Sequence, residues 1–118
     1  MESDQVIAAL SALAQETRLA VFRLLVQAGP AGLAAGCIAG RLELPAATLS
    51  FHLRELSHAG LVKARRQSRS IIYAADFAIM QNLLGFLTEN CCTLTPDASC
   101  DLIPQGCGTS KQQMESLS

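Results

Sequence analysis

The chain has 118 residues, half of them hydrophobic and 16% charged, with a net charge of -1 at pH 7. This length fits one compact domain with a tail and excludes a second domain of ordinary size, while the composition is too apolar for a wholly disordered chain. No apolar run approaches the ~20 residues of a membrane-spanning helix, and no basic segment precedes an apolar block at the N-terminus. We therefore expect a cytoplasmic protein that does not contact a membrane.

Charge is distributed unevenly along the sequence. Residues 1–40 contain two basic and three acidic side chains, residues 41–70 contain six and two, and residues 71–118 contain one and five. A basic segment within a nearly neutral chain is typical of a local surface that faces phosphate groups. The middle third therefore favours nucleic acid as a partner, although the total charge alone argues against it.

Helical spacing of apolar residues begins near the N-terminus. It predicts a first helix over residues 5–14, with Val6, Leu10 and Leu13 on its apolar side, and a second helix over residues 15–27. The first helix carries more apolar surface than a short chain end can cover.

Two further helices are predicted over residues 33–42 and 45–58, with a tight turn between them. We expect Cys37 to be a small buried side chain on the first of them, because unpaired cysteines are often buried. Pro45 suits the first position of the second, where its missing N–H group costs no hydrogen bond. The buried side of that second helix is formed by three leucines, namely Leu49, Leu53 and Leu56.

Two short strands are predicted next, over residues 61–65 and 70–74, with a basic hairpin tip at residues 66–69. A last helix is predicted from Asp76, which suits an N-cap, to about residue 89. Beyond it the apolar periodicity stops. We therefore predict two parts, a folded domain over residues 1–92 and a cysteine-containing loop and tail over residues 93–118.

Two short helices joined by a tight turn and followed at once by a basic hairpin form the pattern of a winged helix-turn-helix. We predict a mainly α-helical fold with a small β-hairpin wing, which binds double-stranded DNA. On the second helix of the pair, the side chains expected to reach bases or phosphates are Thr48, Ser50, Phe51, His52 and Arg54. On the wing, the side chains expected to meet phosphates or an adjacent minor groove are Lys63, Arg65, Arg66 and Arg69.

Each of these features also has a plain structural explanation, since most charged side chains are simply solvated. Phe51 could pack under the wing instead of facing DNA. His52 lies near the edge of the buried stripe, so it is as well suited to a structural hydrogen bond as to a DNA contact.

The segment from Ala47 to Val62 (ATLSFHLRELSHAGLV), followed by Arg65, Arg66, Arg69 and the pair Ile72 and Tyr73, resembles the ArsR/SmtB family of metal-responsive repressors. The resemblance extends over about residues 6–92 and includes Thr17-Arg18-Leu19 in the second helix. It implies a homodimer formed through the first and last helices, which binds operator DNA when empty and releases it when a metal or metalloid binds. At the start of the recognition helix the family usually has a serine, and this chain has Pro45.

The resemblance also points to the position of the inducer site. Arsenic-sensing relatives often carry a Cys-x-Cys pair before the recognition helix, where this chain has Ala34 and Gly36. The Asn-Cys-Cys segment after the last helix looks like the arsenite-responsive branch in which the site has moved there. The expected thiolate ligands of As(III) or Sb(III) are Cys91, Cys92 and Cys100, with Cys107 in reserve, and no organic cofactor is expected.

Soft, trivalent arsenic and antimony select sulfur ligands and need at most three. A structural zinc site built from the four tail cysteines is an alternative, although zinc sites favour pairs separated by two to four residues, and here the pairs are adjacent or six to seven apart. A redox sensor in which Cys91 or Cys92 forms a disulfide to Cys100 or Cys107 is another. An enzyme is not expected, because no phosphate-cradling loop, paired carboxylates or nucleophile with a base is visible.

Overall fold

The computed structural model of the chain describes residues 1–94. Two units are distinguished along the chain, Met1–Phe86 and a second that begins at Leu87. The first unit lies wholly within the predicted domain of residues 1–92. Among the described residues, no helix is long and apolar enough to cross a membrane.

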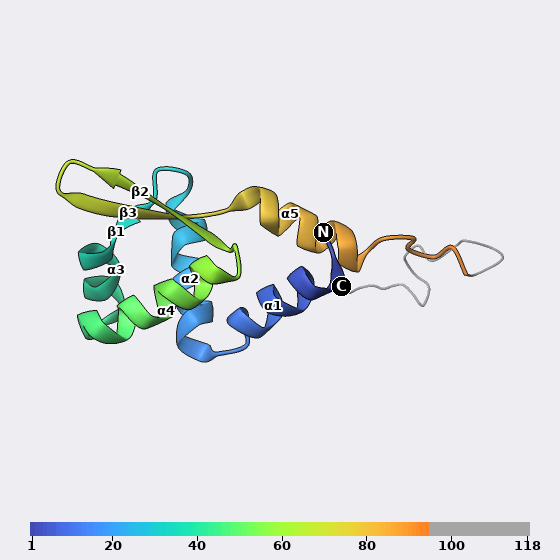
Figure 1. Cartoon of the computed structure of the whole chain (residues 1–118), viewed down its shortest axis with the longest axis horizontal. Helices are drawn as coiled ribbons and strands as arrows, with labels where there is room; N and C mark the ends of the chain where they lie inside the picture. Colours follow the sequence, from blue (N-terminus) through green and yellow to red (C-terminus); the bar gives the residue numbers. More distant parts are fainter. Residues whose placement is uncertain (95–118) are drawn as a thin grey trace. The chain divides into compact units, whose positions relative to one another are not determined.

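The fold is mainly α-helical with one small sheet, as predicted (Figure 1). The elements in chain order are α1 (Ser3–Leu13), α2 (Glu16–Ala28), β1 (Leu33–Ala34), α3 (Ala35–Leu42), α4 (Ala46–His58), β2 (Val62–Gln67), β3 (Ser70–Ala75) and α5 (Phe77–Leu87). Asp76 caps α5 as expected, since its Oδ1 accepts hydrogen bonds from the backbone N–H groups of Ala78 (3.1 Å) and Ile79 (3.2 Å).

The sheet has three antiparallel strands in the order β1-β3-β2, whereas the sequence predicts only the β2–β3 hairpin. The two residues of β1 pair with β3, Leu33 opposite Tyr73 and Ala34 opposite Ile72. The prediction of a helix from residue 33 is therefore wrong by two residues. A two-residue strand cannot show the alternation by which strands are recognised in a sequence.

The core lies between the helices and one face of the sheet, with the strands along one side of α2, α3 and α4 (Figure 1). The predicted leucine stripe of α4 is confirmed, because Leu49, Leu53 and Leu56 are at most 3% exposed. They pack in one cluster with Val21, Phe22, Leu25, Ile38 and Leu61. Burial of this stripe fixes the rotation of α4 about its own axis, so its other side faces outward.

The apolar side of α1 is only partly buried. Val6, Ala9 and Ala12 face the core, while Ile7 is 61% exposed and Leu10 is 43% exposed. Leu10, on the predicted apolar side of this helix, is thus left partly open to solvent. The expectation that α1 has more apolar surface than its own domain covers is confirmed.

The prediction that Cys37 is buried is wrong, because its side chain is exposed and not part of the core. The eight-residue helix α3 buries Ile38, its next residue, as its one fully buried side chain. Neighbouring residues on a helix point about 100° apart, so a helix that turns Ile38 inward turns Cys37 toward solvent.

Gly32 allows β1 to approach β3. Its φ of +71° is unfavourable for residues with a Cβ, and a Cβ there would overlap the backbone carbonyl of Tyr73 and touch the Ile72 side chain. The short strand that precedes α3 therefore depends on a glycine at this position.

We predict that Gly32→Ala destabilises the fold by about 2–4 kcal/mol, since it combines an unfavourable φ with overpacking. The matched control is Gly36→Ala on α3, where a Cβ meets nothing within 4 Å and alanine favours the helix by roughly 0.5–1 kcal/mol. Urea unfolding followed by circular dichroism measures both. Equal stability of the two variants would contradict this account of Gly32.

Candidate nucleic-acid interface and thiol pair

Helices α3 and α4 form the helix-turn-helix. The turn begins at Glu43, which has a left-handed backbone (φ 55°), and the N–H of Leu44 donates to the carbonyl of Ala39 (3.0 Å). Pro45, predicted as the first helical residue, is instead the N-cap of α4, one residue before Ala46, and no side chain caps this end of the helix. The N–H of Leu49 donates to the Pro45 carbonyl (3.0 Å), which closes the first turn.

The outward side of α4 presents most of the predicted contact residues. Thr48, Ser50, Phe51 and Arg54 are all exposed. Phe51 is 47% exposed, so it is not packed under the wing, and its ring meets the ring of His52 edge-on, with centroids 5.3 Å apart. An aromatic ring, a cation and two hydroxyl groups thus share the surface that a recognition helix offers to the major groove.

His52 lies on the buried side of α4, which corrects its place among the DNA-contact residues. Its side chain is only 8% exposed, and its Nδ1 lies 3.3 Å from Nη1 of Arg18 on α2. Because a guanidinium group only donates hydrogen bonds, Nδ1 accepts, so the ring is neutral with its proton on Nε2. Burial lowers the pKa of His52, the Arg18 charge lowers it further, and Glu55 opposes both effects. The ring is therefore a structural partner within the domain.

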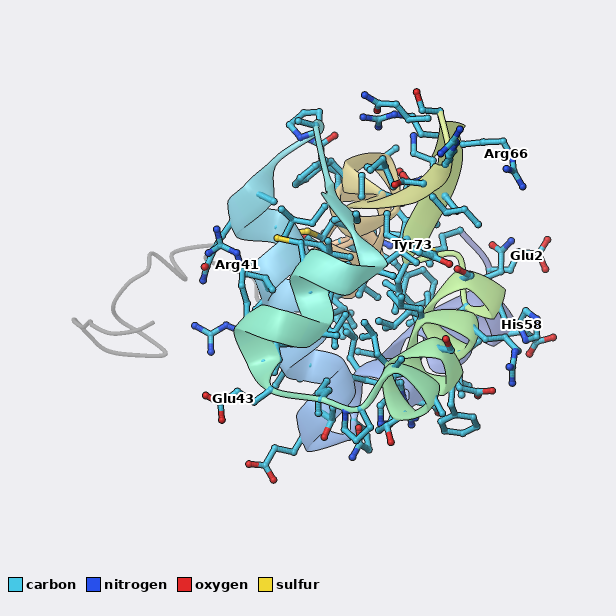
Figure 2. The ribbon with its side chains drawn as sticks, turned by 90° about the vertical axis from the view of Figure 1, so that its left-hand side faces the viewer. Glu2, Arg41, Glu43, His58, Arg66 and Tyr73 are labelled. Carbon is cyan, nitrogen blue, oxygen red and sulfur yellow. The ribbon has the colours of Figure 1, made fainter. Side chains whose placement is uncertain are left out.

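The predicted basic residues of the wing lie on both of its faces. Side chains alternate along a strand, so Arg66 lies on the same face of β2 as Val62, which packs in the core beside α4, whereas Lys63 and Arg65 lie on the opposite face. All of these cations are exposed, and Figure 2 shows Arg66 pointing away from the body of the domain. The hairpin turn consists of Ser68 and Arg69 only, so Arg66 belongs to β2 and not to the predicted tip.

Arg65 has a structural role that the sequence did not indicate. Its Nη2 donates to the carbonyl of Ala31 (2.9 Å), and its Nη1 lies 3.5 Å from the carbonyl of Pro30. The guanidinium group thereby fastens the wing to the loop between α2 and β1. Lys63, Arg66 and Arg69 remain as exposed wing cations that can reach phosphates.

Cys91 and Cys92 form a thiol pair in a turn after α5. The N–H of Cys91 donates to the carbonyl of Thr88 (3.0 Å), and Cys92 has a left-handed backbone (φ 65°). The two Sγ atoms are 3.3 Å apart, too far for a disulfide and close enough for a hydrogen bond. Cys100 and Cys107 lie outside the described residues, and within residues 1–94 no cluster of three or more His, Cys, Asp or Glu side chains occurs.

Comparisons with known proteins agree with this geometry. The sequence profile described as "Helix-turn-helix domain" matches residues 13–65. HlyU from Vibrio cholerae N16961 is 32% identical over 74% of this chain and 97% of that chain, with a TM-score of 0.59. A homodimeric winged helix-turn-helix DNA-binding domain from Mycobacterium bovis, described as a possible ArsR-family transcriptional regulator, is 31% identical over 72% of this chain and 83% of that chain, with a TM-score of 0.57. The chain belongs to the ArsR family of transcriptional regulators.

A third similar structure, the ArsR-like transcriptional regulator from Rhodococcus sp. RHA1, has a TM-score of 0.65 and 28% identity over 71% of this chain and 76% of that chain. No relative among functionally curated proteins matches the sequence. The Rhodococcus protein is described as a transcriptional regulator and the Mycobacterium bovis protein as a possible one, and the helix-turn-helix assigns DNA binding to this chain.

We predict that Arg66→Ala and Arg69→Ala each reduce the slope of log K against log salt concentration by ~0.9, the value for one lost phosphate contact on duplex DNA. Arg65→Ala should reduce it less, because that guanidinium group is held by carbonyl oxygens, and should instead lower the melting temperature. Fluorescence anisotropy at several salt concentrations, with a duplex selected from a random library by the wild-type protein, measures the slopes. An equal reduction for Arg65→Ala and Arg66→Ala would contradict the division of the wing.

Proposed function

We propose that this ArsR-family protein is a homodimeric repressor that binds operator DNA and releases it when As(III) or Sb(III) binds thiolates after α5. Cys91 and Cys92 are the first two ligands, Cys100 is the third, and Cys107 is held in reserve. The observation that carries the proposal is the pair of sulfur atoms 3.3 Å apart, four residues beyond the end of α5.

The chemistry of the pair supports a thiophilic ligand. Two sulfur atoms at that separation can bond to one atom without a change of backbone, and bonds of about 2.3 Å, the length of a zinc–thiolate bond, would meet at an angle of about 90°. This angle is smaller than the tetrahedral angle that zinc prefers and suits a pyramidal centre with a lone pair. Soft trivalent metalloids also select sulfur over oxygen or nitrogen ligands.

Exposed apolar side chains support the homodimer. Ile7 and Leu10 on α1 and Leu84 on α5 are between 43% and 61% exposed, more than isolated surface positions need. The relative from Mycobacterium bovis is described as homodimeric. A two-fold dimer places two recognition helices one turn of DNA apart, so that each reads one half of an operator.

Release follows from the position of the thiols at the end of a dimer helix. Capture of an inducer by Cys91, Cys92 and a tail thiolate changes the end of α5, and through the dimer interface it changes the spacing of the two recognition helices. Coupling free energies of ~1–3 kcal/mol are typical of such linkage, equivalent to ~5–150-fold in operator affinity. That range is sufficient to derepress a promoter.

We predict that Ile7→Glu combined with Leu84→Glu converts the dimer to a monomer, because a carboxylate buried in an apolar interface costs several kcal/mol. Size-exclusion chromatography with light scattering measures the mass. Asp4→Asn, an exposed polar change on α1, is the control and should remain dimeric. A dimer that persists in the double variant would place the interface elsewhere.

We predict that Cys91→Ser and Cys92→Ser each abolish release of DNA by arsenite or antimonite while leaving affinity without inducer within about twofold, because serine keeps the size and loses the soft ligand. Anisotropy with the selected duplex, titrated with arsenite, antimonite, zinc and peroxide, measures release. Cys37→Ser is the matched control, an exposed thiol on α3 that should respond normally.

The same titration separates the alternatives. If zinc or peroxide releases the DNA and arsenite does not, the same fold responds to zinc or to oxidation and not to a metalloid. Loss of the response in Cys107→Ser with a normal response in Cys100→Ser would move the third ligand.

A further inference from the structure

We infer that Arg18 is a positioning residue for the recognition helix α4. Arg18 ties α4 to the end of α1 and so sets the placement of the exposed side of α4, which presents the contact residues to DNA. The inference rests on the proposed function, because it assumes that α4 reads DNA and that α1 forms part of the dimer interface.

The side chain of Arg18 joins three helices. It lies on α2, its Nε donates to the carbonyl of Ala12 in the last turn of α1 (2.7 Å), and its Nη1 donates to Nδ1 of His52 on α4 (3.3 Å). Its own backbone N–H donates to the side chain of Gln15, the N-cap of α2 (2.8 Å). The backbone from which the guanidinium group extends is therefore also fixed.

Both partners suit a rigid, permanently charged donor. Carbonyl groups in the last turn of a helix lack partners within the helix, and the helix dipole favours a cation there. Nδ1 of the buried His52 ring requires a donor, and the guanidinium group is planar with donors in a fixed fork. One flat group thus fixes the distance between the end of α1 and the middle of α4.

The space around this link shows why it is needed. A cleft of about 260 Å³ opens between α1 and α4, lined by Ser11 and Ala12 on one side and by Glu55 and His58 on the other, with Arg18 in its wall. Side-chain packing does not fill the gap at this place. Figure 2 shows His58 pointing outward from α4, away from the core.

Protonation of His52 would break the link, since the ring would then carry a second positive charge and no acceptor at Nδ1. The charged groups that act on this ring are Arg18 from α2 and Glu55 from α4 itself. In the cleft α1 contributes no titratable side chain, and Arg41 of α3 and Lys63 of β2 are exposed.

Burial and Arg18 lower the pKa of His52 in the folded domain. In an unfolded chain a histidine takes up its proton with a pKa of about 6.5, whereas the folded ring stays neutral to a lower pH. The link is complete while His52 is neutral, and it is lost as pH falls through the lowered pKa of the folded ring, below the ordinary histidine value of about 6.5.

The test uses the full chain and a duplex selected from a random library by the wild-type protein. We expect Arg18→Gln and His52→Leu each to weaken binding about tenfold and the double variant to be about tenfold weaker, not a hundredfold, because the two side chains act as one unit. His52→Asn keeps an acceptor near the position of Nδ1 and should bind within about threefold of wild type. Arg23→Gln, an exposed arginine on the same helix, is the control for loss of charge. Circular dichroism at the temperature of the assay establishes that every variant compared is folded.

A pH series provides a readout that a purely structural role would not move. Wild-type affinity should weaken as pH falls through the lowered pKa of His52, below the ordinary histidine value of about 6.5. His52→Asn should lack that component, and His58→Asn, on the exposed side of α4, should keep it. Additive losses in the double variant, an effect of Arg18→Gln no larger than that of Arg23→Gln, or an unchanged pH profile in His52→Asn would each overturn the inference. If the wild-type protein enriches no duplex at all, the proposed function itself fails and the inference fails with it.

Discussion

Burial of one side of α4 is the constraint on which the rest of this molecule depends. Three leucines of that helix are almost fully enclosed by α2, α3 and the first residues of β2, so the helix cannot rotate about its axis without exposing them. Each such side chain contributes about 1.5–3 kcal/mol when buried. The outward position of Phe51 and Arg54 is therefore set by apolar contacts on the opposite side of the same helix.

The same constraint explains why His52 could not be assigned from the sequence. It lies between the exposed Phe51 and the buried Leu53, at the edge of the stripe, where a small rotation decides between the two environments. What settles its role is a donor 34 residues earlier in the chain. Arg18 falls within a segment that resembles the family, but no spacing rule brings a residue of the second helix to the middle of the fourth.

The helices, the hairpin and the order of the elements were predictable because helical periodicity and turn residues act over a few neighbouring positions. Cys37, β1 and Arg65 were not, and the reasons differ. Cys37 lies on a helix of eight residues, too short for a periodic pattern to separate its inner and outer sides. The strand β1 has two residues, and Arg65 is held by carbonyl oxygens of a loop more than 30 residues away. Local patterns thus locate the candidate contact residues, while long-range hydrogen bonds decide which of them remain available.

The pairing of β1 with β3 has a consequence for how chains of this kind can vary in length. Gly32 and the two residues after it connect the end of α2 to the start of α3 through a strand in fixed register, so one additional residue between Gly29 and Leu33 would displace the pairing or the helix-turn-helix that follows. The two-residue turn at Ser68 and Arg69 has no such tie at its outer end. Insertions and deletions among related sequences should therefore gather at the tip of the hairpin, where a longer ribbon changes the reach along DNA and leaves the reading helix in place.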